Sequence, residues 1–212
     1  MKLPSADWTE RRGLAALIAA LDGKARFVGG AVRDTLLGIP VKDVDIATPL
    51  LPEDVIERLA SVSIKVVPTG IDHGTVTAVL PDGPVEITTL RRDVSTDGRR
   101  ATVAFSDDWQ EDAARRDFTI NALSADPATM EIHDYFGGLE NLEQRRIRFI
   151  GSAAERIAED HLRIMRYFRF LARFGLHELD TDAFQACVDA APKLERLSRE
   201  RVADELLKLL AT

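Results

Sequence analysis

The sequence predicts an α/β (α+β) domain with a small mixed sheet over residues 1–150, followed by an all-α domain over residues 151–212. Three observations predict this fold class. In the first part, short β-branched runs alternate with helical segments. From residue 151 onward, apolar residues recur every three to four positions, as they do on one face of a helix. The chain has 212 residues, 45% of them hydrophobic, which is enough for a core in each part.

Strand and helix signals follow one another in the first part. Runs of β-branched or alternating residues predict five strands, at 26–30, 43–48, 64–70, 75–80 and 85–90. Helices are expected at "AVRDTLLG", which ends at Gly38, and at "LPEDVIERLAS", which carries Pro52 and two acids near its first turn. The turn residues of "PDGP" predict that the last two strands form a hairpin.

The second part reads as helical throughout. Helices are expected at 152–175, 180–191 and 198–210, each opened by a Ser or Asp cap. The chain stops at "LLAT", inside the last helical pattern and without a terminal cap. We therefore expect it to be a piece of a longer protein.

Composition narrows the classes of protein that fit. The single cysteine, Cys187, excludes an internal disulfide and favours a reducing compartment, and its helical surroundings predict a buried, inert thiol. The N-terminus has no apolar signal core, and no stretch reaches the ~20 apolar residues of a membrane span. A cytoplasmic protein with no membrane partner is expected, and its oligomeric state stays open. The net charge of −7 argues against a nucleic-acid partner. Arginines nevertheless occur in local clusters, and net charge says little about the local field that a nucleic acid would meet.

Two acids in "KDVDIAT" form the first candidate site. Period two places Asp43 and Asp45 on one face of a strand, about 6–7 Å apart along the chain. Such a pair repels itself unless a cation lies between the carboxylates, and Mg²⁺ takes one or two carboxylates with water and substrate phosphates. Glu86, on a second strand, is a third acid that would complete a two-metal cluster. An exposed strand face is the alternative for all three residues.

A strand, a double glycine and the start of a helix come ten residues earlier, in "FVGGAVRD". Gly29 and Gly30 allow a backbone to approach a ligand closely, and the helix N-terminus favours an anion. Arg33 in the first turn would bind a phosphate. A tight turn that needs glycine only for its dihedral angles is the alternative.

Arginines recur in two further segments. Arg116 lies in "EDAARRDFTINAL", either at a solvated helix end or where it would close over a triphosphate. Residues Asp160, Arg163, Arg166 and Arg169 are spaced by three on an apolar helix, so they form a slowly winding stripe. Guanidinium groups there need partners. Either carboxylates of the protein supply them, or an external anion does.

Six motifs now occur together: "GGAVRD", "KDVDIAT", "VEITTL", "DGRR", "RRDFTINAL" and "EDHLRIMR". In order and spacing they resemble the class II CCA-adding tRNA nucleotidyltransferases and the related bacterial poly(A) polymerases, from about Phe27 to Arg201. The resemblance implies a polymerase-β-like nucleotidyltransferase head followed by a helical neck. It also implies catalysis with two Mg²⁺ ions and substrates that are CTP, ATP and the 3′ end of tRNA.

The resemblance assigns roles to single residues. Asp43 and Asp45 match the metal carboxylates, and Glu86 matches the third catalytic acid. Asp160 and Arg163 resemble the pair that reads the base edge of CTP or ATP. The other positions that match nucleotide contacts are Gly30, Arg33, Arg116, Arg166 and Arg169. Segment 93–105 resembles a flexible loop that helps to switch specificity from C to A; it includes Asp97, Gly98, Arg99 and Arg100.

Three functions are compatible with these motifs. The first is template-independent addition of CCA to tRNA from CTP and ATP, with release of pyrophosphate. The second is a poly(A) polymerase, which uses ATP alone, and the third is a binding module without catalysis. The match to the flexible loop and the compact length favour the first, and the intact carboxylates argue against the third. Full enzymes of the family continue into body and tail domains that hold tRNA, so this head and neck portion is expected to bind nucleotides but to extend tRNA weakly.

Overall fold

The computed structural model describes residues 1–96, 101–175 and 179–212. Contacts between Cα atoms divide the chain into two compact units. Unit 1 comprises Met1–Asp93, Val103–Arg115 and Asn121–Tyr135, and unit 2 comprises Val94–Thr102, Arg116–Ile120 and Phe136–Thr212. The division of the chain at residue 150 stays a prediction.

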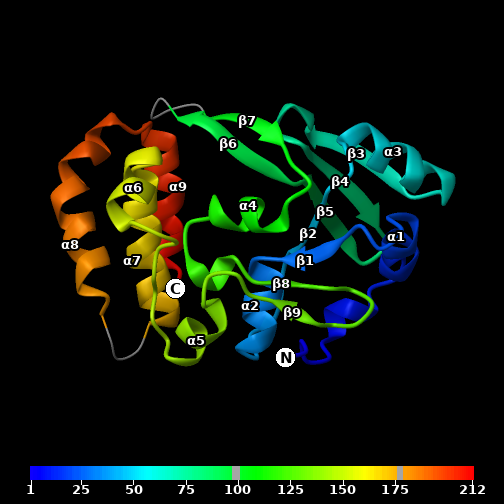
Figure 1. Cartoon of the computed structure of the whole chain (residues 1–212), viewed down its shortest axis with the longest axis horizontal. Coiled ribbons are helices and arrows are strands. Elements are labelled where there is room, and N and C mark those ends of the chain that lie inside the picture. Colours follow the sequence, from blue (N-terminus) through cyan, green and yellow to red (C-terminus); the bar gives the residue numbers. More distant parts are fainter. Residues whose placement is uncertain (97–100, 176–178) are drawn as a thin grey trace. The chain divides into compact units, whose positions relative to one another are not determined.

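Unit 1 is built on a seven-stranded mixed sheet with the strand order β3-β4-β5-β2-β1-β8-β9 (Figure 1). Only the central pair, β2 and β5, runs parallel, while the other neighbours are antiparallel. The strands are β1 (Arg26–Val28), β2 (Val44–Thr48), β3 (Lys65–Gly70), β4 (Thr75–Leu80), β5 (Gly83–Thr89), β8 (Ser124–Ala125) and β9 (Ile132–His133). The five strands and the hairpin expected from the sequence are confirmed, and the sheet is mixed as expected.

Alternation along the strands gives this sheet one apolar face. Ile46, Val76, Val85 and Ile87 are buried, whereas their neighbours Asp45 and Glu86 are not. Side chains of successive strand residues point to opposite faces, so the acids lie on the other face from this core. We call that second side of the sheet the carboxylate face.

Helices of unit 1 pack against the sheet. α3 contacts β3 and β4, and α2 contacts β1 and β2. Proline opens α3 at Pro52, followed by two acids in the first turn, as the sequence predicted. The helices of this unit are α1 (Leu14–Ala20), α2 (Gly30–Leu36), α3 (Pro52–Ser61) and α4 (Trp109–Ala114), with 3₁₀ turns at Asp7–Glu10 and Ile71–His73.

A separate two-stranded sheet consists of β6 (Arg91–Thr96) and β7 (Ala101–Phe105). The segment between these two strands holds four residues that resemble the flexible loop of the family, and they lie outside the described residues: Asp97, Gly98, Arg99 and Arg100.

Unit 2 is helical. α6 packs on α8 and α7 packs on α9 (Figure 1). The expected caps are confirmed, because the side chains of Ser152, Asp180 and Ser198 each accept a hydrogen bond from a backbone N–H in the first turn of the helix that follows. The helices are α5 (Gly138–Glu143), α6 (Ala153–Glu159), α7 (Leu162–Phe174), α8 (Thr181–Ala190) and α9 (Arg199–Leu210), with a 3₁₀ helix at Ala191–Arg196. A further 3₁₀ turn, Thr119–Asn121, begins in unit 2 and ends in unit 1.

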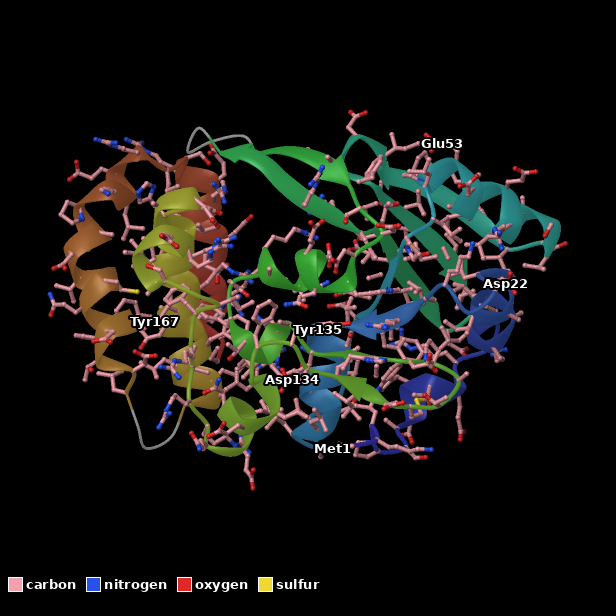
Figure 2. The ribbon with its side chains drawn as sticks, in the orientation of Figure 1. Met1, Asp22, Glu53, Asp134, Tyr135 and Tyr167 are labelled. Atoms are coloured by element: carbon pink, nitrogen blue, oxygen red, sulfur yellow. The ribbon has the colours of Figure 1, made fainter. Side chains whose placement is uncertain are left out.

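An aromatic core holds unit 2 together. Tyr167, labelled on α7 in Figure 2, is fully buried and stacks on Phe149, with ring centroids 5.6 Å apart. Phe118 contacts Phe149 and Phe170 at 4.9 and 5.0 Å between centroids. Burial of large rings in such tilted pairs contributes much of the stability of a small helical unit.

Candidate active site

Two of the three predicted acids lie on the central strands of the sheet in unit 1. Asp45 on β2 and Glu86 on β5 are register partners in the parallel pair. Partners in neighbouring strands point to the same face with their backbones about 4.8 Å apart, so both carboxylates project from the carboxylate face. Asp43 is exposed and lies directly before β2, which begins at Val44, rather than inside the strand as expected. Its direction is therefore not imposed by the pleat.

The carboxylates of Asp43 and Asp45 suit a Mg²⁺ ion that is bound together with a nucleotide. Within the described residues, no group of three or more His, Cys, Asp or Glu side chains is arranged to hold a metal ion. Two carboxylates are nevertheless what a catalytic Mg²⁺ usually takes from a protein, since water and substrate phosphates complete its shell. Asp43 and Asp45 thus fit a metal that arrives with a nucleotide, and they do not form a preassembled cage.

A glycine turn connects β1 to α2. Gly29 has φ +63° and ψ −121°, a backbone conformation that residues with a Cβ rarely adopt. Its N–H donates to the carbonyl of Leu123 at 3.2 Å, and its carbonyl accepts from the N–H of Arg33 at 3.0 Å. The glycine at this position is required by the backbone, as the simpler interpretation of the sequence held.

Arg33 is folded back toward the N-terminus of α2. A Cβ added to Gly30 would lie 3.7 Å from Nη2 of Arg33, so the guanidinium lies over the glycine. Arg33 is only 7% exposed and donates from Nε to Asp34 Oδ1 at 2.8 Å. Its Nη1 donates to Oδ1 of Asn121 at 2.5 Å. These contacts fix the guanidinium before any ligand binds.

Sequence reasoning missed Asn121 as a partner of Arg33. The signal was present, because a polar Asn stands inside the apolar run "FTINAL" and is 7% exposed in the structure. Buried amides are almost always hydrogen-bonded, so a partner had to exist. Its identity, 88 residues away, was not readable from the pattern.

The predicted helix 152–175 is wrong as a single element. It is two helices, and Asp160 lies between them with an extended backbone at φ −152° and ψ 106°. The Oδ1 of Asp160 accepts from the N–H of Leu162 at 3.1 Å, and its carbonyl accepts from the N–H of Arg163 at 3.0 Å. A short acidic side chain that bonds the backbone two residues on competes with the helix. Asp160 therefore precedes α7, and the stripe on that helix contains only the arginines.

Each arginine of the stripe has a carboxylate of unit 2 beside it. The pairs are Arg163 with Glu159 at 2.5 Å, Arg166 with Asp117 at 2.5 Å and Arg169 with Glu205 at 2.5 Å. Buried guanidinium groups need such partners, so the internal carboxylates explain why an apolar helix carries them. Glu205 was not predicted from the sequence, although it is 3% exposed within a helix of mostly exposed polar residues.

The two residues expected to read the base edge, Asp160 and Arg163, differ in their exposure to solvent. Asp160 has a third of its side chain exposed, and its Oδ2 accepts from Nη2 of Arg201 at 2.7 Å. The side chain of Arg163 is 14% exposed and also donates to the carbonyl of Arg156 at 3.0 Å. Asp160 is thus the more accessible of the two. Arg116 is half-buried in the turn before Phe118.

No helix in the described part of the chain is long and apolar enough to cross a membrane.

Comparison with known proteins supplies the family. The profile of the poly A polymerase head domain matches residues 25–148, and that of the probable RNA and SrmB-binding site of polymerase A matches residues 177–212. The mitochondrial CCA tRNA nucleotidyltransferase 1 of Homo sapiens is 44% identical over 206 residues, which are 94% of this chain and 46% of that protein. The CCA-adding enzyme of Streptococcus sanguinis strain SK36 is 45% identical, over 98% of this chain and 51% of that enzyme.

Solved structures agree with these relatives. The CCA-adding enzyme of Bacillus stearothermophilus in complex with CTP superposes with a TM-score of 0.81 at 43% identity, over 92% of this chain and 47% of that one. The CCA-adding enzyme of Thermotoga maritima complexed with tRNA gives 0.75 at 27% identity, over 93% and 47%. The chain spans about half the length of the curated relatives it matches. With the mixed sheet, the acid pair and the glycine turn in place, this chain belongs to the family of the poly A polymerase head domain, as a polymerase-β-like nucleotidyltransferase fold.

Proposed function

We propose that this chain is the catalytic portion of a template-independent nucleotidyltransferase that adds CCA to the 3′ end of tRNA from CTP and ATP and releases pyrophosphate. The observation that carries the proposal is the register of Asp45 and Glu86 on the parallel pair β2 and β5, one strand away from the turn at Gly29. The similarity to CCA-adding enzymes, which extends over almost the whole chain, supports the choice of reaction.

Within unit 1 the parts have separate tasks. Asp43 and Asp45 would hold Mg²⁺, which when bound activates the attacking 3′-hydroxyl and neutralises charge on the triphosphate. Glu86 projects from the same face and accepts a hydrogen bond from the attacking hydroxyl. This bond orients the hydroxyl and assists the removal of its proton. Arg33 and the N-terminus of α2 at Gly29 and Gly30 bind the triphosphate, whose negative charge matches both the guanidinium and the helix end.

Within unit 2 the parts select the nucleotide. Asp160 accepts from the exocyclic amino group that cytosine and adenine share, and Arg163 donates to a ring nitrogen or a carbonyl. Guanine and uracil present the opposite pattern, and a site built for hydrogen bonds strongly rejects a ligand that leaves them unmade. Arg116 binds the triphosphate. Arg166 and Arg169 contact the nucleotide through donors that their ion pairs with Asp117 and Glu205 leave over.

The proposal also assigns a separate role to each of the two predicted domains. Residues 1–150 act as the catalytic head, and residues 151–212 act as the neck that selects nucleotides and begins the RNA-binding region. The match of residues 177–212 to an RNA-binding profile supports the second half of this statement. The lone, buried Cys187 favours a reducing compartment, and we place the protein in the cytoplasm.

A poly(A) polymerase is the second candidate, because both matching profiles are named for that enzyme. The two functions share their chemistry and differ in the product. A tRNA transcript that lacks its 3′ CCA is incubated with Mg²⁺ and CTP, ATP or both, and the products are resolved by length. Growth by three nucleotides only when both are present supports CCA addition, whereas a long ladder with ATP alone supports poly(A) synthesis. If CTP and ATP bind but no RNA is extended, the proposed activity needs more of the protein than these 212 residues.

A further inference from the structure

Three residues of unit 1 that the proposed reaction does not use form a polar–aromatic cluster. The guanidinium carbon of Arg26 lies 4.2 Å from the centroid of the Trp109 ring. Nη1 of Arg26 donates to the hydroxyl of Tyr135 at 3.1 Å, and Tyr135 is 37% exposed on the segment that follows β9 (Figure 2). We call Arg26, Trp109 and Tyr135 the Arg26 platform. The stacking and the hydrogen bond hold the planar guanidinium in one orientation.

The Arg26 platform lies on the carboxylate face. β1 pairs antiparallel with β2, with Arg26 opposite Ala47. Ala47 is two residues from Asp45, so both point to the same face, and so does Arg26. Trp109 packs on Val28 and Ala47 from that side. The platform is therefore built onto the same surface as the catalytic acids, about 7 Å along the strand from Asp45.

The position along the strand separates the platform from the phosphate site. Continuing the register of β1 and β2 places Val28 beside Asp45, and the glycine turn follows Val28. From Val28 to Gly29 the chain thus runs away from Asp45 toward the Asp43 end of β2, and Arg26 lies toward the other end of β2. In phosphoryl transfer the attacking and leaving oxygens are roughly in line on opposite sides of the phosphorus. With pyrophosphate leaving on the side of the glycine turn, the attacking 3′-hydroxyl approaches from the side of the Arg26 platform.

The chemistry of the cluster suits the end of an RNA strand. Unpaired bases of RNA stack on aromatic rings and on the planes of arginine side chains, and such stacking tolerates any base. The acids Asp45 and Glu86 project from the same face, so a phosphate is the less suitable ligand here. We propose that the Arg26 platform stacks the unpaired 3′-terminal base of the RNA primer and so positions its hydroxyl for attack; this rests on the proposed function.

The test measures binding of RNA separately from catalysis. A fluorescently labelled tRNA transcript without its 3′ CCA is titrated with the 212-residue chain, and affinity is read from anisotropy. Arg26→Ala is expected to weaken RNA binding about tenfold, the size of one lost stacking contact, and to leave CTP affinity unchanged. Arg26→Lys keeps the charge but has no plane, so it is expected to bind RNA as weakly as Arg26→Ala. Arg58→Ala is the matched control, since Arg58 is a half-buried arginine on α3 with one bond to the carbonyl of Ala20.

A transcript with an abasic 3′-terminal nucleotide identifies the contact. Wild-type protein is expected to bind it as weakly as Arg26→Ala binds the intact transcript, and the variant is expected to lose nothing further. Tyr135→Phe removes only the hydrogen bond to Arg26 and is expected to give a smaller loss, which keeps the test valid if Arg26→Ala unfolds. The proposal is overturned if Arg26→Ala binds RNA like wild type, if Arg26→Lys restores the affinity, or if the wild-type chain binds no RNA. Failure of the proposed function looks different: RNA binds in an Arg26-dependent way, yet no nucleotide is added.

Discussion

Arg166 on α7 donates from Nε and from Nη2 to one carboxylate oxygen of Asp117, at 2.8 and 2.5 Å. Desolvation lowers the pKa of Arg166, but the charge of Asp117 and the hydrogen bonds to it outweigh this and raise the pKa above its ordinary value. The other oxygen of Asp117 accepts from the N–H of Phe118 at 2.8 Å. One buried carboxylate thus ties α7 to the segment that carries the central ring of the aromatic core of unit 2.

Removal of this carboxylate is expected to destabilise the protein. Asp117→Ala leaves Arg166 and the N–H of Phe118 without their partner, and we expect a loss of about 2 kcal/mol in the free energy of unfolding, discounted because Arg166 is a third exposed. Urea titration measures it. Asp82→Ala, which breaks an exposed pair with Arg12, is the control and is expected to change little. Equal stabilities of Asp117→Ala and wild type would contradict the role given to this pair.

The pair between Arg169 and Glu205 separates structure from nucleotide binding. Both side chains are buried, so Glu205→Ala strands a charge and is expected to cost about 3 kcal/mol of stability. The double variant Arg169→Met, Glu205→Leu removes both charges and is expected to regain most of that loss. Because Arg169 is proposed to contact the nucleotide, the double variant is expected to bind CTP more weakly than wild type in calorimetry. Unchanged CTP affinity in a stable double variant would leave Arg169 with a structural role only.

Base selection is expected to depend on Asp160. An Asn at this position offers both a donor and an acceptor, so Asp160→Asn is expected to weaken binding of CTP and ATP about tenfold and to reduce discrimination against UTP and GTP. Equilibrium binding of all four nucleotides measures both effects. Asp189→Asn is the control, because Asp189 is an exposed acid on α8 that accepts from Gln185. A variant that keeps the wild-type preference would show that another residue reads the base.

The thiol of Cys187 is expected to be inert in the folded protein. It is fully buried on α8, and burial raises its pKa to about 12. A thiol whose pKa is higher in the folded state than in the unfolded chain stabilises the fold below the unfolded value near 9, and this contribution falls as the pH rises from there toward 12. The melting temperature of wild type is therefore expected to fall more steeply between pH 9 and 11 than that of Cys187→Ala.

Reaction with a thiol reagent gives a second readout of the same residue. At pH 8 the native protein is expected to react only after urea is added, since the thiolate is the reactive form. Rapid labelling of the folded protein would contradict the burial of Cys187.

Local pattern predicted much of the fold. Alternation placed Glu86 opposite the buried residues Val85 and Ile87, and the cap residues marked where α8 and α9 begin. The pairing of β2 with β5 was not readable, because β3 and β4 come between them in the chain and nothing local states which strands become neighbours. The alignment of Asp45 with Glu86 is therefore a product of the fold.

The ion-pair partners of the arginine stripe were likewise not readable from the sequence. Helical spacing predicted that Arg163, Arg166 and Arg169 lie near one another, but two of their partners come from 49 and 36 residues away. The helical periodicity also continues through Asp160 and does not show the break between α6 and α7. An aspartate looks the same in the sequence whether it lies inside a helix or precedes one. The family resemblance supplied roles for these positions, whereas the ion pairs emerged only from the structure.

Transfer of nucleotides by the carboxylate face is the central claim, and the most direct measurement is the rate at which labelled CMP is added to a tRNA transcript without CCA. Wild type is compared with Asp45→Asn, a change of one oxygen to an amide, and with Asp82→Asn at an exposed turn of the same unit. We expect Asp45→Asn to lower the rate about a thousandfold or more, as loss of a metal carboxylate should, while Asp82→Asn stays near wild type. An Asp45→Asn variant that adds CMP at the wild-type rate would contradict the account.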